Sequence, residues 1–287
     1  MADLVSPAPA DDGPSIRSYV VAHDGGERGR DALALGAVLS RSLAVELEVV
    51  FVVRTDDPFA GPYPPVGDVT GLVAETGQEF LDEELAALPG DVVARSHVRT
   101  AESVPEGLLA AVEEFGAAAV VVGAGGRNPL GVGPVARALL HSSPVPVVLA
   151  AETPGVERID TLYVALGTRP GAEAVLAEAQ EGADRAGLPL HVVSLLDLDG
   201  RAEEGGSSRQ RVEELLAGLT DASIHVGEGT SMAEAVASID WEPGGLLLVG
   251  SSRLARGRQT FLGPTAARMI RHVPVPVVVV PRAEVAR

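Results

Sequence analysis

The stretch PVPVVLA at residues 144–150 returns as PVPVVVV at residues 274–280. A Gly-Pro pair precedes each stretch at the same spacing, at Gly133-Pro134 and again at Gly263-Pro264. Farther upstream, an apolar run ends in glycine both times. Strand, glycine loop, helix and strand, in that order, are typical of an α/β unit that cradles phosphate. The sequence therefore predicts two domains of one kind, with two candidate sites to compare.

The elements predicted around this repeat indicate an α/β fold. Strands alternate with helices in both halves, which implies parallel strands joined by right-handed crossovers. Residues 117–122 and 246–249 are continuously apolar, as expected for strands in a sheet covered on both faces. We predict one domain over residues 15–151 and a second over residues 159–283, joined by a linker in which Pro154-Gly155 breaks regular structure.

The same five-strand order is predicted twice. The expected strands are Tyr19–Asp24, Val45–Val53, Val92–Val98, Ala117–Val122 and Val145–Ala150, then Thr161–Leu166, Leu188–Leu196, Ser223–Val226, Gly245–Val249 and Val275–Val280. The expected helices are Asp31–Leu43, Leu72–Leu88, Glu106–Phe115 and Val135–His141, then Ala172–Ala186, Gln210–Leu219, Ala233–Ile239 and Ala266–Arg271. Residues 54–70, rich in proline and glycine, are predicted to form a long loop of the kind that covers binding sites.

The composition of the 287-residue chain excludes several chemistries. There is no cysteine, so thiol nucleophiles, disulfides and zinc–thiolate sites are impossible. All 22 strongly basic residues are arginine, which excludes a P-loop lysine and a Schiff-base lysine. A net charge of −18 disfavours binding to nucleic acid. We find neither an apolar run long enough to span a membrane nor a signal peptide, so a cytoplasmic protein is expected.

The two repeated apolar stretches each contain a proline, Pro146 and Pro276. Proline within a sheet belongs on an edge strand, and an apolar edge strand is a pairing hazard unless it is covered. The natural solution is that residues 145–149 and 275–280 pair with each other. We therefore predict an intramolecular pseudo-dimer through the two fifth strands, with pairing between chains, in a homodimer, as the other arrangement.

These motifs resemble those of the universal stress protein family. That family has a glycine after strand four, a second glycine three residues on, a nine-residue loop, and then Gly-Ser or Gly-Thr opening a helix before a Pro-Val strand. The closing element, residues 133–148 and 263–279, carries the most specific part of the resemblance. The chain resembles a tandem form of the family along nearly all its length.

The resemblance implies two Rossmann-like domains, each with a five-stranded parallel sheet of order 3-2-1-4-5. It also implies adenine-nucleotide binding, such as ATP binding, in members whose loop is intact. In those members the residue at Asp24 and the end of strand two, at Val53 here, contact adenine and ribose. The glycine loop and its Ser or Thr hold the phosphates, and many members without the motif bind no nucleotide.

The first copy of the loop keeps Gly123, Gly126 and Gly133 but departs from the family elsewhere. The segment from Arg127 to Val132 is shorter than nine residues, and Pro134 stands in the Ser/Thr position. Proline has neither an N–H nor a hydroxyl, so two phosphate donors are lost. Proline is also well suited to a first helical position, which is a sufficient structural role.

Asp24 has two interpretations in this first copy. It stands where the family contacts the nucleoside, and it is also a good turn and helix-capping residue.

The second copy has a full-length loop with different departures. Gly250 and Gly263 are kept, but Arg253 replaces the second glycine and Pro264 again replaces Ser or Thr. Thr265, one residue on, is the nearest hydroxyl. The arginines at 253, 256 and 258 make the loop basic, which suits either an anion site or a solvated surface loop. Gly167 or Thr168 falls at the position of Asp24, so the acidic contact is lost.

No histidine spacing in the sequence suggests a metal site, and no nucleophile–base pair is evident. We therefore expect no metal ligands and no catalytic residues. Our main hypothesis is a non-catalytic stress-response regulator or scaffold with weak or absent nucleotide binding. The second is an adenine-nucleotide-binding stress protein with a variant loop, in the first half above all. The third, an enzyme of the wider adenine-nucleotide hydrolase-like group, has the least support.

Overall fold

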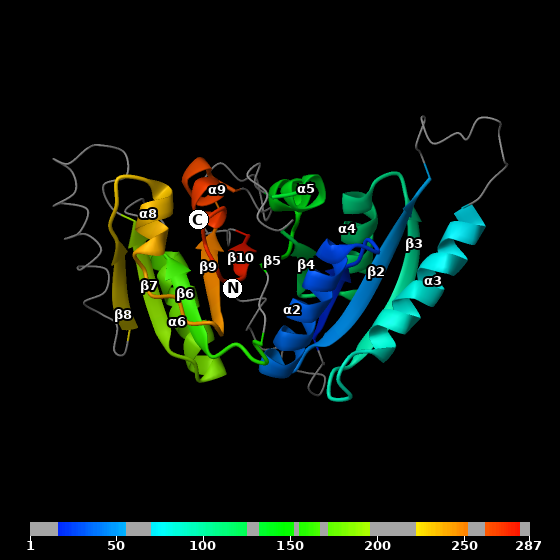
Figure 1. The fold of residues 1–287 in the computed structure, drawn as a ribbon, viewed down its shortest axis with the longest axis horizontal. Coiled ribbons are helices and arrows are strands. Elements are labelled where there is room, and N and C mark those ends of the chain that lie inside the picture. The colour runs from blue at the N-terminus through cyan, green and yellow to red at the C-terminus, as the bar shows by residue number, and fades with distance from the viewer. Residues whose placement is uncertain are drawn as a thin grey trace, which may run out of the picture.

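The computed structural model describes residues 17–55, 70–124, 132–151, 155–166, 172–195, 222–251 and 262–281. Figure 1 shows two similar halves side by side, each with strands at its centre and helices packed against them. Most of the predicted long loop at 54–70 and the whole predicted helix at 210–219 lie outside the described residues. None of the helices in the described ranges is both long and apolar enough to cross a membrane.

The first half alternates strands and helices in the predicted order. Its elements are β1 Ser18–Ala22, α2 Glu27–Leu43, β2 Glu46–Arg54, α3 Thr70–Ala86, β3 Ala94–Ala101, α4 Val104–Phe115, β4 Ala119–Gly123, α5 Pro134–Ser142 and β5 Val147–Ala150. The main difference from the prediction is at α2, which begins four residues before the predicted start at Asp31. The missed turn is polar, so hydrophobic periodicity did not reveal it.

The second half repeats this order with the described elements β6 Thr161–Ala165, α6 Ala172–Ala186, β7 Leu190–Leu195, β8 Ala222–Gly227, α8 Met232–Ala237, β9 Gly245–Gly250, α9 Pro264–Ile270 and β10 Val277–Val280. Predicted and observed bounds coincide for α6 and differ by up to two residues for most other elements here. Differences of this size are usual at element ends, where a hydrophobic pattern does not mark the last residue of a helix or strand.

The ten strands within the described ranges form one sheet of order β3-β2-β1-β4-β5-β10-β9-β6-β7-β8. The α/β class predicted from the sequence is confirmed, and strands within each half are parallel. Each half has its strands in the order 3-2-1-4-5, but the two sheets are not separate. They join through β5 and β10, which are antiparallel.

The junction of β5 and β10, which we call the seam, is formed by valine and leucine. Val277 pairs with Leu149, Val278 with Val148, and Val279 with Val147. The prolines do not lie inside these strands, as the sequence suggested, but directly before them. Each proline still serves the sheet through its carbonyl oxygen: that of Pro146 accepts from an amide of β4 at 3.0 Å, and its counterpart before β10 accepts from β9 at 2.9 Å.

The seam is buried from both sides. Val148 and Val278 belong to a core cluster with α2 and α6, whereas their neighbours along the strands face a second cluster with α5 and α9. Both clusters contain residues of both halves, so each layer of core runs across the seam without a break. Near the linker, Ile159 donates its amide to the Ser42 hydroxyl at the end of α2, at 2.8 Å, which ties the halves together again.

We expect Val278→Asp to unfold the seam, because Val278 is fully buried opposite Val148. An unpaired carboxylate there has no solvent and no partner, so the free energy of unfolding should fall by more than about 4 kcal/mol. Urea denaturation followed by circular dichroism measures the change. The matched control is Val93→Asp, at a site that is 51% exposed, where the change should stay within about 0.5 kcal/mol. Equal effects of the two substitutions would contradict this account of the seam.

Candidate functional site

The candidate site of the first half lies where β1 and β4, neighbouring parallel strands, reach their carboxyl ends. Ligands of open α/β sheets bind at such a point. Asp24 follows β1, and its Oδ1 accepts hydrogen bonds from the amides of Gly26, at 2.9 Å, and Gly29, at 3.2 Å. Gly26 is the N-cap of α2 and has no capping side chain of its own. Asp24 thus binds free amides in the first turn of α2, which is the structural role proposed for it from the sequence.

His23, beside Asp24, is buried at the same strand end and only 4% exposed. Its Nδ1 accepts the amide of Gly25 at 3.1 Å, so the ring proton of the neutral imidazole is on Nε2. Among the described residues, this Nε2 has no hydrogen-bond partner. Burial lowers the pKa of His23. The ring packs at 5.2 Å from that of Phe80 on α3, so it acts as a neutral core residue.

Gly123, the first glycine of the predicted loop, lies against the start of α2. A Cβ on Gly123 would overlap the carbonyl oxygen of Arg28 and lie 2.7 Å from the Arg28 Cβ. The absence of a side chain is therefore needed for α2 to pack on the end of β4. The sequence assigned this glycine to phosphate binding, but the packing of α2 is by itself enough to explain it.

Gly133 caps α5, and Pro134 is the first residue of the helix, with no side-chain cap. The guanidinium of Arg28 extends to this point: its Nη1 lies 3.2 Å from where a Gly133 Cβ would be. Arg137, one turn into α5, also lies here and donates to the carbonyl of Val132 at 3.4 Å. The structure therefore brings two arginine side chains to the start of α5, where the family resemblance implied phosphate.

Arg28 was missed in the sequence because the predicted start of α2 placed it in a loop. The usable signal was Asp24 followed by glycines, which is a capping pattern and would have put residue 28 in the first helical turn.

The other residues predicted for the first site are only partly brought together. Val53, near the end of β2, is buried and pairs with Thr100 of β3. Gly126 and Arg127 lie outside the described residues.

The second half has the same arrangement of strand ends and helix starts, but fewer of its predicted site residues lie in the described part of the chain. Gly250 ends β9, and a Cβ there would lie 2.7 Å from a methyl group of Val175, an apolar residue of α6. Gly263 caps α9, which begins with Pro264, and Thr265 is exposed in its first turn. Arg253 and the residues at the position equivalent to Asp24 lie outside the described part of the chain.

A groove with a volume of about 940 Å³ lies elsewhere on the first half. It is lined mainly by α4 and by the segments that lead into β4 and β5, so it faces the amino ends of these strands. The predicted nucleotide site is at their carboxyl ends. This groove therefore adds nothing to that site.

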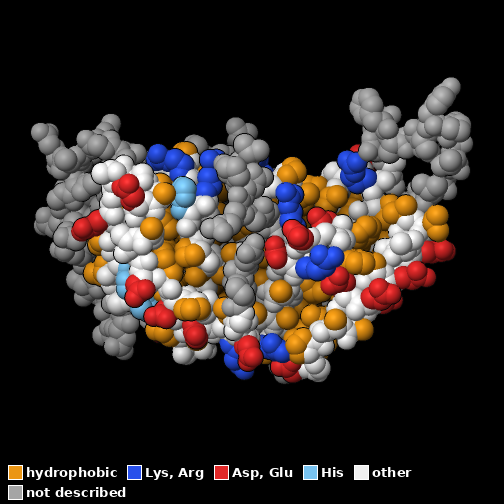
Figure 2. Space-filling model, in the orientation of Figure 1, with side chains coloured by type: hydrophobic (Ala, Val, Ile, Leu, Met, Phe, Trp, Pro, Cys, Tyr) orange, Lys and Arg blue, Asp and Glu red, His pale blue; other side chains and the backbone are white. Residues whose placement is uncertain are grey.

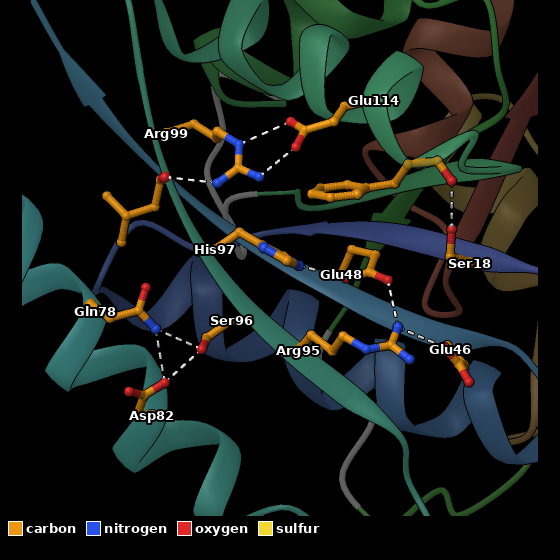
Figure 3. A network of polar contacts seen from close by, with 12 residues as sticks. Ser18, Glu46, Glu48, Gln78, Asp82, Arg95, Ser96, His97, Arg99 and Glu114 are labelled. Atoms are coloured by element: carbon orange, nitrogen blue, oxygen red, sulfur yellow. Dashed lines mark hydrogen bonds and ion pairs between the residues drawn. The ribbon is translucent and has the colours of Figure 1, made fainter.

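A polar network covers the outer strands of the first half on the side of α4 (Figure 3). The side chain of Glu48 on β2 is only 8% exposed and accepts from His97 at 2.5 Å and from Arg95 at 2.8 Å, both on β3. Farther along, Arg99 forms two bonds to Glu114 at 2.7 and 3.0 Å. Arg95, His97 and Arg99 lie on the edge strand β3, where charged side chains discourage pairing with another chain. We assign this network to stability.

The fold and its sites define the class of the protein: a tandem α/β protein of the Rossmann-like kind, with helix N-termini at the carboxyl ends of a parallel sheet. The model of the universal stress protein family matches residues 16–150 and again residues 159–281, so the chain belongs to that family. The resemblance found in the sequence is thereby confirmed.

Relatives and solved structures agree with this assignment. Universal stress protein Rv2319c of Mycobacterium tuberculosis is 28% identical over 299 aligned positions, covering 92% of this chain and 99% of the relative. Universal stress protein Mb2346c of Mycobacterium bovis gives the same values. The crystal structure of a universal stress protein from Archaeoglobus fulgidus superposes with a TM-score of 0.67 at 20% identity, covering 93% of this chain and 98% of that one. At that identity the likeness shows the fold alone.

Gly123→Ala should destabilise the protein, because the new methyl group would overlap backbone atoms of α2. We expect a loss of about 2–4 kcal/mol in the free energy of unfolding, as for other overpacked sites. Gly90→Ala is the matched control, since a Cβ there meets nothing within 4 Å. Urea denaturation of both variants measures the two free energies of unfolding. A Gly123→Ala protein as stable as Gly90→Ala would show that α2 does not depend on this contact.

The free energy of unfolding should fall with acidification through His23. Its folded pKa is below the ordinary value of 6.5, so the unfolded chain binds more protons and stability declines as the pH drops below that value. His23→Gln should make the slope of stability against pH between pH 7.5 and 5 shallower. Substitution of the exposed His272 by Gln is the control and should leave the slope unchanged. Parallel slopes for parent and His23→Gln would be evidence against this role.

Proposed function

We propose that this chain is a tandem universal stress protein that acts without catalysis, as a regulatory or scaffolding module, and binds adenine nucleotides weakly or not at all. One observation carries the proposal: both helices that would face the phosphates, α5 and α9, begin with Gly-Pro and have no side-chain cap. A phosphate site needs amide and hydroxyl donors at that place. Proline removes both in each half.

The surroundings of the first site support the same proposal. The Asp24 oxygen that would meet a nucleoside already accepts two amides of α2, and Gly123 is in close contact with the helix. In the second half, Val175 occupies the equivalent contact with Gly250. Each of these features has a structural function that is complete without a ligand. The negative net charge also opposes binding of a polyphosphate.

As part of the proposal, the two halves form an intramolecular pseudo-dimer in solution, with the seam as its interface. The eight buried seam residues and the linker contact at Ile159 support this arrangement. The Val278→Asp variant tests it as well. Hydrogen exchange should then accelerate in both β4 and β9, and acceleration in β9 alone would contradict a shared interface.

A second candidate function is nucleotide binding in the first half, and the position of Arg28 favours it. The guanidinium of Arg28 lies beside Gly133, and Arg137 lies one turn farther along α5. Side-chain charge could replace the lost Ser or Thr as the phosphate ligand, since arginine matches phosphate geometry. On this alternative the ligand is ATP or another adenine nucleotide.

Nucleotide content separates the two candidates. Protein purified without added nucleotide is denatured, and the supernatant is analysed by ion-pair chromatography; calorimetry with ATP and cyclic AMP follows. The scaffold proposal predicts far less than one nucleotide per chain and no saturable heat. Stoichiometric nucleotide or saturable binding would refute it and support the second candidate.

If binding is found, charge reversal identifies the site. Arg28→Glu should then weaken ATP binding at least tenfold, while the control Arg271→Glu, at the far end of α9, should not. Similar losses in both variants would indicate a general charge effect and would remove Arg28 as a phosphate ligand.

A further inference from the structure

Two histidines and a serine of the second half meet on neighbouring strands. His191 of β7 pairs in register with Ser223 of β8, and His225 lies two residues farther along the same strand. Alternate residues of a strand share a face, so all three side chains lie on one side of the sheet. Histidine side chains, in pale blue, reach the surface of the second half in Figure 2.

Three donor atoms converge in this cluster. Nδ1 of His191 lies 2.7 Å from Nε2 of His225 and 2.7 Å from the Ser223 hydroxyl, which is itself 3.2 Å from Nε2 of His225. The three atoms thus form a nearly equilateral triangle. At most one proton can lie between the two imidazole nitrogens, so at least one of them is unprotonated, and its lone pair becomes available to a metal ion once the ring–ring hydrogen bond is broken.

The arrangement does not suit a catalytic relay. In a nucleophile–base–orienter triad, the base meets the nucleophile with one ring nitrogen and the orienting group with the other. Here the Ser223 hydroxyl and the His225 ring both meet the same atom, Nδ1 of His191. Three donor atoms within 3.2 Å of one another are instead close enough to share one metal ion after a small separation. The serine–histidine contact itself corrects the view from the sequence that no such pair exists.

The equivalent strand positions of the first half hold a chemically different cluster. There, Glu48 pairs with Arg95 across the two outer strands as His191 pairs with Ser223, and His97 takes the place of His225. The first-half cluster holds a carboxylate together with a guanidinium and is internally compensated. In the second half an imidazole replaces the carboxylate and a hydroxyl replaces the guanidinium. The result is a cluster of two imidazoles and a hydroxyl, without the carboxylate and the guanidinium of the first half.

We propose that His191, His225 and Ser223 form a binding site for a divalent first-row transition metal ion such as Zn²⁺. Imidazole nitrogens select such metals over Mg²⁺ and Ca²⁺. Tetrahedral Zn–N bonds of about 2.0–2.1 Å place two nitrogens roughly 3.3 Å apart, so the imidazoles need only a small separation from their present contact. Ser223 is exposed on the edge strand β8, which gives the ion access and leaves the remaining coordination position to water.

The residues around the cluster suit this ligand set. The ring of Tyr163 packs at 5.2 Å from that of His191 and at 4.8 Å from Trp241, and forms one wall. The Tyr163 hydroxyl accepts the amide of Glu242 at 2.9 Å, which fixes that wall. Among the described residues, no group of three or more His, Cys, Asp or Glu is placed to hold a metal ion, so this mixed set differs from a closed structural zinc site.

Calorimetric titration of the chelator-treated full chain with Zn²⁺ tests the proposal. We expect one saturable site in the micromolar range and at least a tenfold loss of affinity in both His191→Gln and His225→Gln. Ser223→Ala should cause a smaller loss, because water can replace a hydroxyl. The matched control is His272→Gln, an exposed histidine on the same half, which should bind as the parent does. No saturable binding by the parent, or an unchanged affinity in His191→Gln, would overturn the proposal.

A spectroscopic measurement keeps the test decisive if a glutamine variant does not fold. The parent loaded with one equivalent of Cu²⁺ should show hyperfine coupling to two imidazole nitrogens in its electron paramagnetic resonance spectrum. His225→Gln, if folded by circular dichroism, should show coupling to one. Coupling to no imidazole nitrogen in the parent would rule out the site.

Discussion

The seam between β5 and β10 is the constraint on which the rest of the structure depends. Each strand would be an apolar edge if its half stood alone, and such an edge must be covered. Antiparallel pairing of Val147–Leu149 with Val277–Val279 satisfies the backbone and buries the side chains at the same time. Two sheets thereby become one, and the core layers on both faces run across the boundary. Because β5 and β10 are antiparallel, this pairing also sets the direction of the strands of one half, and of the candidate site at their carboxyl ends, relative to those of the other half.

The two regions that correspond to the nucleotide loop keep the positions that packing needs, while the residues expected to hold phosphate differ from the family pattern. Glycine at positions 123 and 250 remains necessary because a helix of each half packs against it. The helix starts at 134 and 264 remain, but proline has taken over a position at which phosphate binding needs a donor. The glycines that have been retained are therefore those that the packing of a helix requires. This selective retention is the main support for the scaffold that we propose.

The outer strands of the two halves have diverged in a different way. Equivalent positions hold a compensated ionic network around Glu48 and a neutral cluster around His191. Both lie on edge pairs of strands, where side chains can change without disturbing the seam. The duplicated fold therefore offers two chemically different surfaces on one rigid sheet. Stability accounts for the first, and the convergence of donor atoms distinguishes the second.

The sequence by itself determined the α/β class, the internal repeat, the family and the loss of Ser or Thr at both helix starts. Those features are local patterns of hydrophobicity, glycine and proline, and local patterns can be read without a structure. Only the tertiary structure decided that Gly123 serves the packing of α2, that Arg28 reaches the start of α5, and that His191 meets His225. These contacts join residues far apart in the chain, and they depend on strand register and on where a polar helix turn begins. A polar helix turn carries no apolar periodicity, and no tight turn fixes the register between parallel strands, which are joined by long crossovers.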